Sequence, residues 1–263
     1  MTLTLAEKVL NGNRRAIARL ITHVENKYPE AQEALSQLYP HTGRAHLIGV
    51  TGAPGTGKSS LVNAFAMQYR QMEKTVAILA VDPSSPFSGG AVLGDRIRMQ
   101  DLSGDPGVFI RSMASRGGPG GLAWAVDDAL KVLDAAGFDI ILIETVGAGQ
   151  NEVEIVRSAH TIVVVEAPGL GDDIQAIKAG ILEIADIFVV NKADRQGVNR
   201  TAVALERMLQ LGHTPAHKVM HHGTLMSIEA SPSTEHDEIS MWTIPVLKTI
   251  ALKNEGIDAV LEA

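Results

Sequence analysis

The chain of 263 residues is long enough to bury a substantial core, as one large or two small domains. Its residues are 45% apolar but only 4% aromatic, which favours an aliphatic α/β fold, and its formal charge of −7 disfavours nucleic acid and membrane surfaces as partners. The absence of cysteine excludes disulfides and thiolate sites, and no apolar run approaches the roughly 20 residues that span a bilayer, so we expect a cytoplasmic protein.

Residues 1–42 are predicted to form a small helical appendage to a domain of residues 43–263. Thr4 and Glu7 have the spacing of a capping box at the start of a short helix. A second helix follows, because four apolar residues recur at i, i+3, i+4 and i+7 over residues 17–24. Pro29 suits the first turn of a third helix.

From Ala45 onward, short apolar runs alternate with helical patterns, which indicates an α/β fold with a mostly parallel central sheet and helices on both faces. The expected strands are 45–50, 75–81, 108–111, 138–143, 161–166, 187–191 and 244–248, and the expected helices are 58–72, 118–136, 174–184 and 199–211. Residues 213–240, with five histidines, many polar residues and Pro232, are predicted to be an exposed insertion.

The segment Gly52–Ser59 matches the phosphate-binding pattern G-x-x-x-x-G-K-[ST] and lies between a predicted strand and a predicted helix. Glycines let the backbone N–H groups point at phosphate, Lys58 is expected to reach the β and γ phosphates, and the Ser59 hydroxyl is expected to ligate Mg²⁺. The predicted phosphate-loop residues are Gly52, Ala53, Pro54, Gly55, Thr56, Gly57, Lys58, Ser59 and Ser60. The motif predicts a P-loop nucleotide hydrolase.

Acidic residues at strand ends are the further candidates for metal binding and hydrolysis. Glu144 ends a buried strand where many GTPases have D-x-x-G, and its extra methylene leaves two roles open: metal binding through water, or orientation of the nucleophile. Gly147 is expected to lend its N–H to the γ-phosphate, and Ala148 replaces a water-positioning glutamine, which predicts slow intrinsic hydrolysis. Asp82, at the end of the neighbouring strand, and Asp95 are the other candidates for Mg²⁺.

The pattern N-K-x-D at Asn191–Asp194 predicts a pocket for guanine. The Asp194 carboxylate can accept from the ring N–H and the amino group of guanine, whereas adenine presents an acceptor at the ring position. Asn191 is expected to tie this loop to the phosphate loop, and the Lys192 stem to cover the base. Thr249, Ile250 and Ala251 are weaker candidates for a second base-contacting loop.

Together, these stretches resemble the MeaB/ArgK family of G proteins, which includes the methylmalonic aciduria type A proteins. The longest similar stretches are Val81–Phe87, Leu93–Met99, Glu144–Gln150 and Gly171–Lys178, and the resemblance spans residues 10–212. It implies a P-loop NTPase of the SIMIBI type, GTP and Mg²⁺ as ligands, and Gly169–Lys178 as a nucleotide-sensitive switch. It also implies a GTPase chaperone of an adenosylcobalamin-dependent acyl-CoA mutase, usually methylmalonyl-CoA mutase, that assists cofactor loading, protection or reactivation.

The family's C-terminal dimerisation arm has no counterpart before Ala263, so we do not expect a homodimer by that route. Two other functions stay open. A nickel metallochaperone GTPase would use histidines such as His213, His217, His221 and His222. A kinase, following an old transport-kinase label of the family, would need an acceptor pocket with a positioned base, which the sequence does not reveal.

Overall fold

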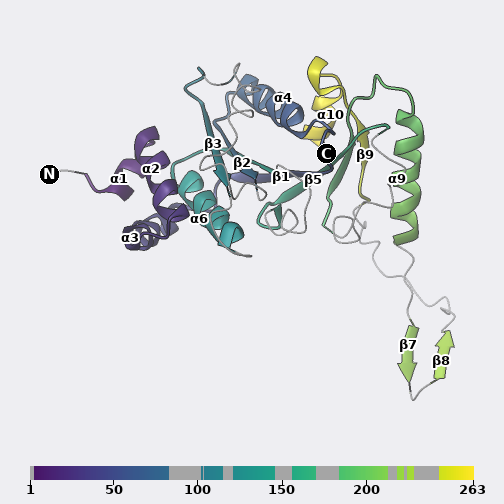
Figure 1. The fold of residues 1–263 in the computed structure, drawn as a ribbon, viewed down its shortest axis with the longest axis horizontal. Coiled ribbons are helices and arrows are strands. Elements are labelled where there is room, and N and C mark those ends of the chain that lie inside the picture. Colours follow the sequence, from purple (N-terminus) through teal and green to yellow (C-terminus); the bar gives the residue numbers. More distant parts are fainter. Residues whose placement is uncertain are drawn as a thin grey trace, which may run out of the picture.

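A computed structural model describes residues 3–82, 102, 104–114, 121–145, 156–169, 184–212, 218–221, 224–227 and 243–263. Its centre is a seven-stranded, all-parallel sheet in the order β3-β2-β4-β1-β5-β6-β9 (Figure 1). The strands are β1 (His46–Thr51), β2 (Val76–Asp82), β3 (Val108–Ala114), β4 (Ile140–Thr145), β5 (Thr161–Glu166), β6 (Ile187–Val190) and β9 (Val246–Lys248). The predicted α/β class is confirmed.

Strand β1 is central, with β4 on one side and β5 on the other. Val50 lies opposite Glu144 on β4 and opposite Val163 on β5. The chain builds the β2 side of the sheet first and then crosses to the β5 side, so the strand order reverses around β1. In open α/β sheets, ligands bind at the carboxyl ends of the strands at such a reversal. A ligand is therefore expected to bind at the loops that follow β1, β4, β5 and β6.

Helices cover both faces because successive strand residues point to opposite sides. On β2, the side chains of Ala77 and Leu79 lie on the face that is covered by the N-terminal helices and α6 (Gly121–Ala135), whereas those of Val76 and Ile78 lie on the opposite face. That other face is covered by α4 (Lys58–Gln71), by η4 (Ala251–Lys253) and by α10 (Ile257–Glu262). Helix α9 (Val198–Gly212) packs with a third cluster that includes Val164 and Phe188.

The three predicted N-terminal helices are present as α1 (Leu5–Leu10), α2 (Arg14–Glu25) and α3 (Pro29–Leu38), followed by η1 (Tyr39–His41). The Thr4 hydroxyl accepts from the Glu7 N–H at 3.2 Å, and the Glu7 carboxylate accepts from the Thr4 N–H at 2.7 Å. This is the predicted capping box. The apolar stripe of α2 is buried, as its spacing requires.

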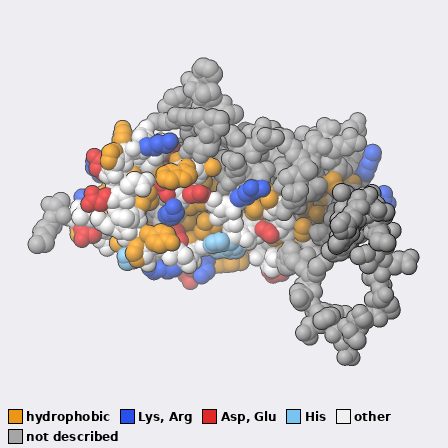
Figure 2. All heavy atoms as spheres, turned by 90° about the horizontal axis from the view of Figure 1, so that it is seen from below, with side chains coloured by type: hydrophobic (Ala, Val, Ile, Leu, Met, Phe, Trp, Pro, Cys, Tyr) orange, Lys and Arg blue, Asp and Glu red, His pale blue; other side chains and the backbone are white. Residues whose placement is uncertain are grey.

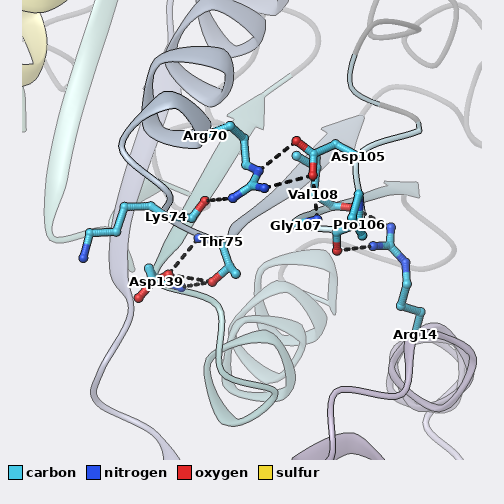
Figure 3. A network of polar contacts seen from close by, with 9 residues as sticks. All are labelled: Arg14, Arg70, Lys74, Thr75, Asp105, Pro106, Gly107, Val108 and Asp139. Carbon is cyan, nitrogen blue, oxygen red and sulfur yellow. Dashed lines mark hydrogen bonds and ion pairs between the residues drawn. The ribbon is translucent and has the colours of Figure 1, made fainter.

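The N-terminal helices are fastened to the edge of the sheet. Arg14 of α2 donates to the Pro106 carbonyl at 3.1 Å and to the Val108 carbonyl (Figure 3). Arg111 of β3 pairs with Glu25 at the end of α2. Because α1–α3 share one hydrophobic cluster with β2, β3 and α6, they cover that face of the sheet. The division of the chain at residue 42 stays a prediction.

Several boundaries differ from those predicted. Strand β3 runs to Ala114 rather than residue 111, because the polar residues Arg111 and Ser112 interrupt the apolar pattern but still pair with β2. Strand β4 extends to Thr145, so Glu144 lies within it. A hairpin of β7 (Lys218–His221) and β8 (Thr224–Ser227) forms a separate sheet inside the predicted insertion, where no strand was expected. The expected helix 174–184 falls mainly outside the described residues.

None of the helices in the described part of the chain has the length and apolarity needed to cross a membrane. On the face in Figure 2, acidic and basic side chains are interspersed with apolar ones.

Candidate nucleotide site

The phosphate loop, residues 52–57, connects β1 to α4 at the reversal of strand order. Its glycines are required by geometry. Gly52 has φ +140°, and a Cβ there would lie 2.1 Å from the Val165 carbonyl oxygen of β5. Gly57 has φ +96° as the N-cap of α4, and a Cβ there would lie 2.4 Å from the Asn191 amide nitrogen. Any side chain at either position would push apart the loops that these glycines bring together.

Lys58, the first residue of α4, turns back onto the phosphate loop. Only 7% of its surface is exposed, and its ammonium donates to the carbonyls of Gly52 at 2.7 Å and Ala53 at 3.1 Å. The Thr56 hydroxyl also donates to the Ala53 carbonyl, at 2.9 Å. A fixed positive charge thus lies within the loop at the N-terminus of a helix, an arrangement that attracts phosphate.

Ser59 and Glu144 meet beside the loop on the β4 side. The Ser59 hydroxyl donates to Glu144 Oε1 at 2.5 Å, and Glu144 is only 1% exposed. A hydroxyl and a carboxylate are oxygen donors of the kind that Mg²⁺ prefers, so this pair fits the predicted metal. Asp82 ends β2, the strand beside β4, as expected, whereas Asp95 and Gly147 lie outside the described residues.

Asn191 joins the base loop, residues 191–194, to the phosphate loop. It is 2% exposed, and its amide nitrogen donates to the Thr56 carbonyl at 3.0 Å. Its amide oxygen accepts from the Thr249 hydroxyl and from the Ala251 N–H, each at 3.1 Å. One side chain therefore connects three loops, which follow β1, β6 and β9. Sequence reasoning anticipated the first of these connections and placed 249–251 nearby.

Lys192 and Asp194 lie at the outer side of the same junction. Lys192 adopts φ +58°, and its ammonium donates to the Gly55 carbonyl at 2.5 Å. Asp194 is exposed. The Ala193 N–H donates to the Thr249 carbonyl at 3.0 Å, which fixes the backbone between them. The junction leaves the Asp194 carboxylate accessible to a ligand beside the phosphate loop.

The family model for the methylmalonyl Co-A mutase-associated GTPase MeaB matches residues 17–263. The chain belongs to the MeaB family of GTPases. A putative GTPase of Pyrococcus abyssi is 51% identical over 253 residues, covering 96% of this chain and 72% of that protein. The GTPase ArgK of Escherichia coli is 38% identical over 267 residues, covering 99% and 75% respectively. A mitochondrial methylmalonic aciduria type A homolog of Caenorhabditis briggsae is 31% identical over 271 residues, covering 97% and 61%.

Solved structures share the fold of this chain. A structure described as a LAO/AO transport system kinase superposes with a TM-score of 0.72 at 28% identity, covering 98% of this chain and 72% of that one. The hydrogenase maturation factor HypB of Archaeoglobus fulgidus superposes with a TM-score of 0.53 at 17% identity, covering 94% and 96%. The second likeness shows a shared P-loop NTPase fold and nothing about function.

Sequence reasoning missed one residue at this site of the MeaB-family chain, Glu166. It ends β5, and its carbonyl accepts from the Asn191 N–H at 2.8 Å. Burial raises the pKa of its carboxyl to about 7, while the nearby Lys58 ammonium acts to lower it. The signal was present in the sequence: an acidic residue ends an otherwise apolar strand, in the way that Glu144 stands near the end of β4.

Proposed function

We propose that the protein binds Mg·GTP on the phosphate and base loops and hydrolyses it to GDP and phosphate. The observation that carries this proposal is the Asn191 junction, which fixes a guanine-type base loop against the phosphate loop. A GTP whose guanine is held by Asp194 would then place its phosphates near Lys58, because the two loops are held at a fixed separation. The family to which the chain belongs supports the same activity.

Each residue has a distinct task in this proposal. Lys58 and the loop N–H groups hold the β and γ phosphates. Ser59 and Glu144 hold Mg²⁺ directly or through water, with Asp82 and Asp95 as further acidic groups, and the metal would neutralise charge that develops on the phosphate oxygens. Gly147 contacts the γ-phosphate and reports its loss. Because Ala148 replaces a water-positioning side chain, intrinsic hydrolysis is slow and a partner accelerates it.

Exchange of the Asp194 carboxylate tests the base assignment. Asp194→Asn should weaken GDP binding roughly a hundredfold, because two charge-assisted hydrogen bonds to guanine are lost. It should strengthen binding of xanthosine diphosphate, whose carbonyl at the position of the guanine amino group accepts from an amide. Asp258→Asn, at an exposed residue of α10 that pairs with Gln68, is the matched control. Equal GDP affinities for wild type and Asp194→Asn would refute the base assignment.

We further propose that the nucleotide cycle serves an adenosylcobalamin-dependent acyl-CoA mutase, with methylmalonyl-CoA mutase as the first candidate. The supporting findings are the description of the family as mutase-associated and the 31% identity to a methylmalonic aciduria type A homolog. In this role the protein would be a chaperone that admits, protects or restores the cobalamin cofactor, and the GTP state would time each step.

Calorimetry with purified apo-mutase tests this role. Binding should differ between the GDP state and a state with a non-hydrolysable GTP analogue, and the mutase should raise the rate of phosphate release. The Asp194→Asn variant, assayed with guanine nucleotides, is the control for nucleotide dependence. Failure to bind any cobalamin-dependent mutase in either state would refute the partner while leaving the GTPase proposal intact.

The kinase alternative has one finding in its favour, the description of the solved structure at 28% identity. Incubation with γ-labelled GTP and candidate acceptors separates the two functions: free phosphate alone supports a GTPase, and a labelled acceptor supports a kinase. The nickel alternative finds no support among the described residues, which contain no group of three or more His, Cys, Asp or Glu side chains able to hold a metal. The side chains of the histidines proposed for it are not among those described.

A further inference from the structure

Glu166 stands where the phosphate loop and the base loop converge. The phosphate loop approaches β5 so closely that a Cβ on Gly52 would lie 2.1 Å from the carbonyl oxygen of Val165, the residue before Glu166. On the other side, the Asn191 N–H donates to the Glu166 carbonyl at 2.8 Å. The backbone of Glu166 is thus held between the two loops, and its carboxyl lies near enough to Lys58 for that ammonium to act on it.

Among the described residues, few charges act on this carboxyl. Lys58 is the cation in the described part of the chain that acts on it, and burial is the larger influence. Lys192, on the β6 side, directs its ammonium to the Gly55 carbonyl. Strand β1 contributes the uncharged Thr51 at this end, and Asp172 and Asp173, later in the chain after β5, lie outside the described residues. Because burial outweighs the attraction of Lys58, the carboxyl has a pKa of about 7.

A bound nucleotide changes this balance. Its phosphates bring two or more negative charges to Lys58, so the Lys58 ammonium then pairs with the phosphates. The ionised Glu166 carboxylate loses part of that attraction and is also repelled by the phosphates. We propose that Glu166, which lies at the junction of the two loops and within electrostatic reach of Lys58, takes up a proton when a nucleoside di- or triphosphate binds, so that nucleotide affinity depends on pH. The inference rests on the nucleotide site proposed above and requires nothing of the mutase role.

The size of the effect follows from the ionisation of the free protein. With a pKa of about 7, Glu166 is protonated in about nine of ten molecules at pH 6 and in about one of eleven at pH 8. If the bound form is fully protonated, binding at pH 8 is weakened about elevenfold, and binding at pH 6 is weakened only about 1.1-fold. Glu166→Gln, which stays neutral at every pH, removes this penalty.

Isothermal calorimetry of Mg·GDP binding measures both consequences. Titrations at pH 6, 7 and 8, each in two buffers of different ionisation enthalpy, give the dissociation constant and the number of protons taken up. Wild type, Glu166→Gln and the control Glu206→Gln, at an exposed carboxylate of α9, are compared. Ionisation of the nucleotide itself is common to all three proteins and cancels in the differences.

At pH 7, wild type should take up about 0.5 proton more than Glu166→Gln. The ratio of their dissociation constants should rise from about 1 at pH 6 to roughly 10 at pH 8. Glu206→Gln should behave as wild type. Equal proton counts and parallel pH profiles for wild type and Glu166→Gln would overturn the inference, whereas absence of GDP binding to wild type at pH 6 would overturn the nucleotide site itself.

If Glu166→Gln does not fold, infrared difference spectra of wild type and Glu166→Asp at pH 8 provide the second measurement. GDP binding should produce the band of a newly protonated carboxyl group in wild type, and that band should shift in Glu166→Asp. Spectra without such a band, or with one that does not change in the variant, contradict the inference.

Discussion

Replacing Asn191 with alanine tests whether one side chain holds the nucleotide site together. The substitution removes the donor to the Thr56 carbonyl and the acceptor for the Thr249 hydroxyl and the Ala251 N–H. These partners lie in a buried region, where water does not readily replace the lost bonds. At about 1 kcal/mol for each bond, Asn191→Ala should lower the free energy of unfolding by about 3 kcal/mol, more than a hundredfold in the equilibrium constant.

The assay is urea unfolding followed by far-ultraviolet circular dichroism, without nucleotide and again with saturating GDP. Asn199→Ala is the matched control, because Asn199 makes one exposed bond, from the Lys248 ammonium at 2.8 Å, and its loss should change stability by less than about 0.5 kcal/mol. GDP should also stabilise Asn191→Ala less than it stabilises wild type, because the loops that would bind it are no longer joined.

Equal stabilities of Asn191→Ala and Asn199→Ala would show that the Asn191 side chain does not hold the three loops together. If Asn191→Ala loses stability but binds GDP as wild type does, the junction supports the fold and not the nucleotide site.

Three further predictions concern the phosphate loop, the N-terminal helices and the half-buried Glu166 carboxyl. Gly57→Ala should abolish measurable GDP binding, because it combines positive φ with a Cβ 2.4 Å from a buried amide, whereas Gly12→Ala, with positive φ and open space, should cost only about 1 kcal/mol and keep binding; equal binding losses would contradict this. Arg14→Ala should destabilise the protein by roughly 1 kcal/mol in urea unfolding, because its bonds to the Pro106 and Val108 carbonyls are lost, and Arg15→Ala should not; equal effects would exclude the anchoring role. The pKa of Glu166 is higher in the folded protein, about 7, than in the unfolded chain, about 4.5. The free energy of unfolding of ligand-free wild type should therefore fall by up to about 3 kcal/mol as the pH rises from 4.5 to 7, and stay constant above pH 7. This fall should be missing in Glu166→Gln, and matching pH profiles of the two proteins would refute the prediction.

Much of the fold could be predicted because its elements are specified locally. The capping box at Thr4, the apolar stripe of α2 and the strands of near-continuous aliphatic residues each carry their signal within a few residues. Boundaries failed where tertiary contacts override the pattern: β3 continues through Arg111, whose charge is paired with Glu25 on a helix distant in sequence. The β7–β8 hairpin escaped prediction because its two strands have only 4 residues each, too few for an alternation of apolar and polar residues to be recognised.

The candidate site divides in the same way. Lys58, Ser59 and Asn191 belong to motifs with fixed spacing, so their neighbourhood was predictable, and the structure brings Ser59 to Glu144 and Asn191 to Thr56. Glu166 had a local signal as the acidic end of an apolar strand, but its importance depends on the approach of Gly52 to β5 and on the raised pKa of the carboxyl, which arise from residues distant in sequence.

Glu144 and Glu166 lie on opposite sides of the proposed nucleotide site, and the charge of each carboxylate is balanced in a different way. Strand β1 is flanked by β4 and β5, and each carries a glutamate that interacts with one of the first two residues of α4: Glu144 accepts a hydrogen bond from Ser59, and Glu166 feels the charge of Lys58. On the β4 side, a divalent cation can offset the charge of a carboxylate beside the phosphates. On the β5 side the described residues offer Lys58 alone, which the phosphates also require. Charge balance there is reached by a proton, so magnesium and pH should tune nucleotide affinity through separate carboxyl groups.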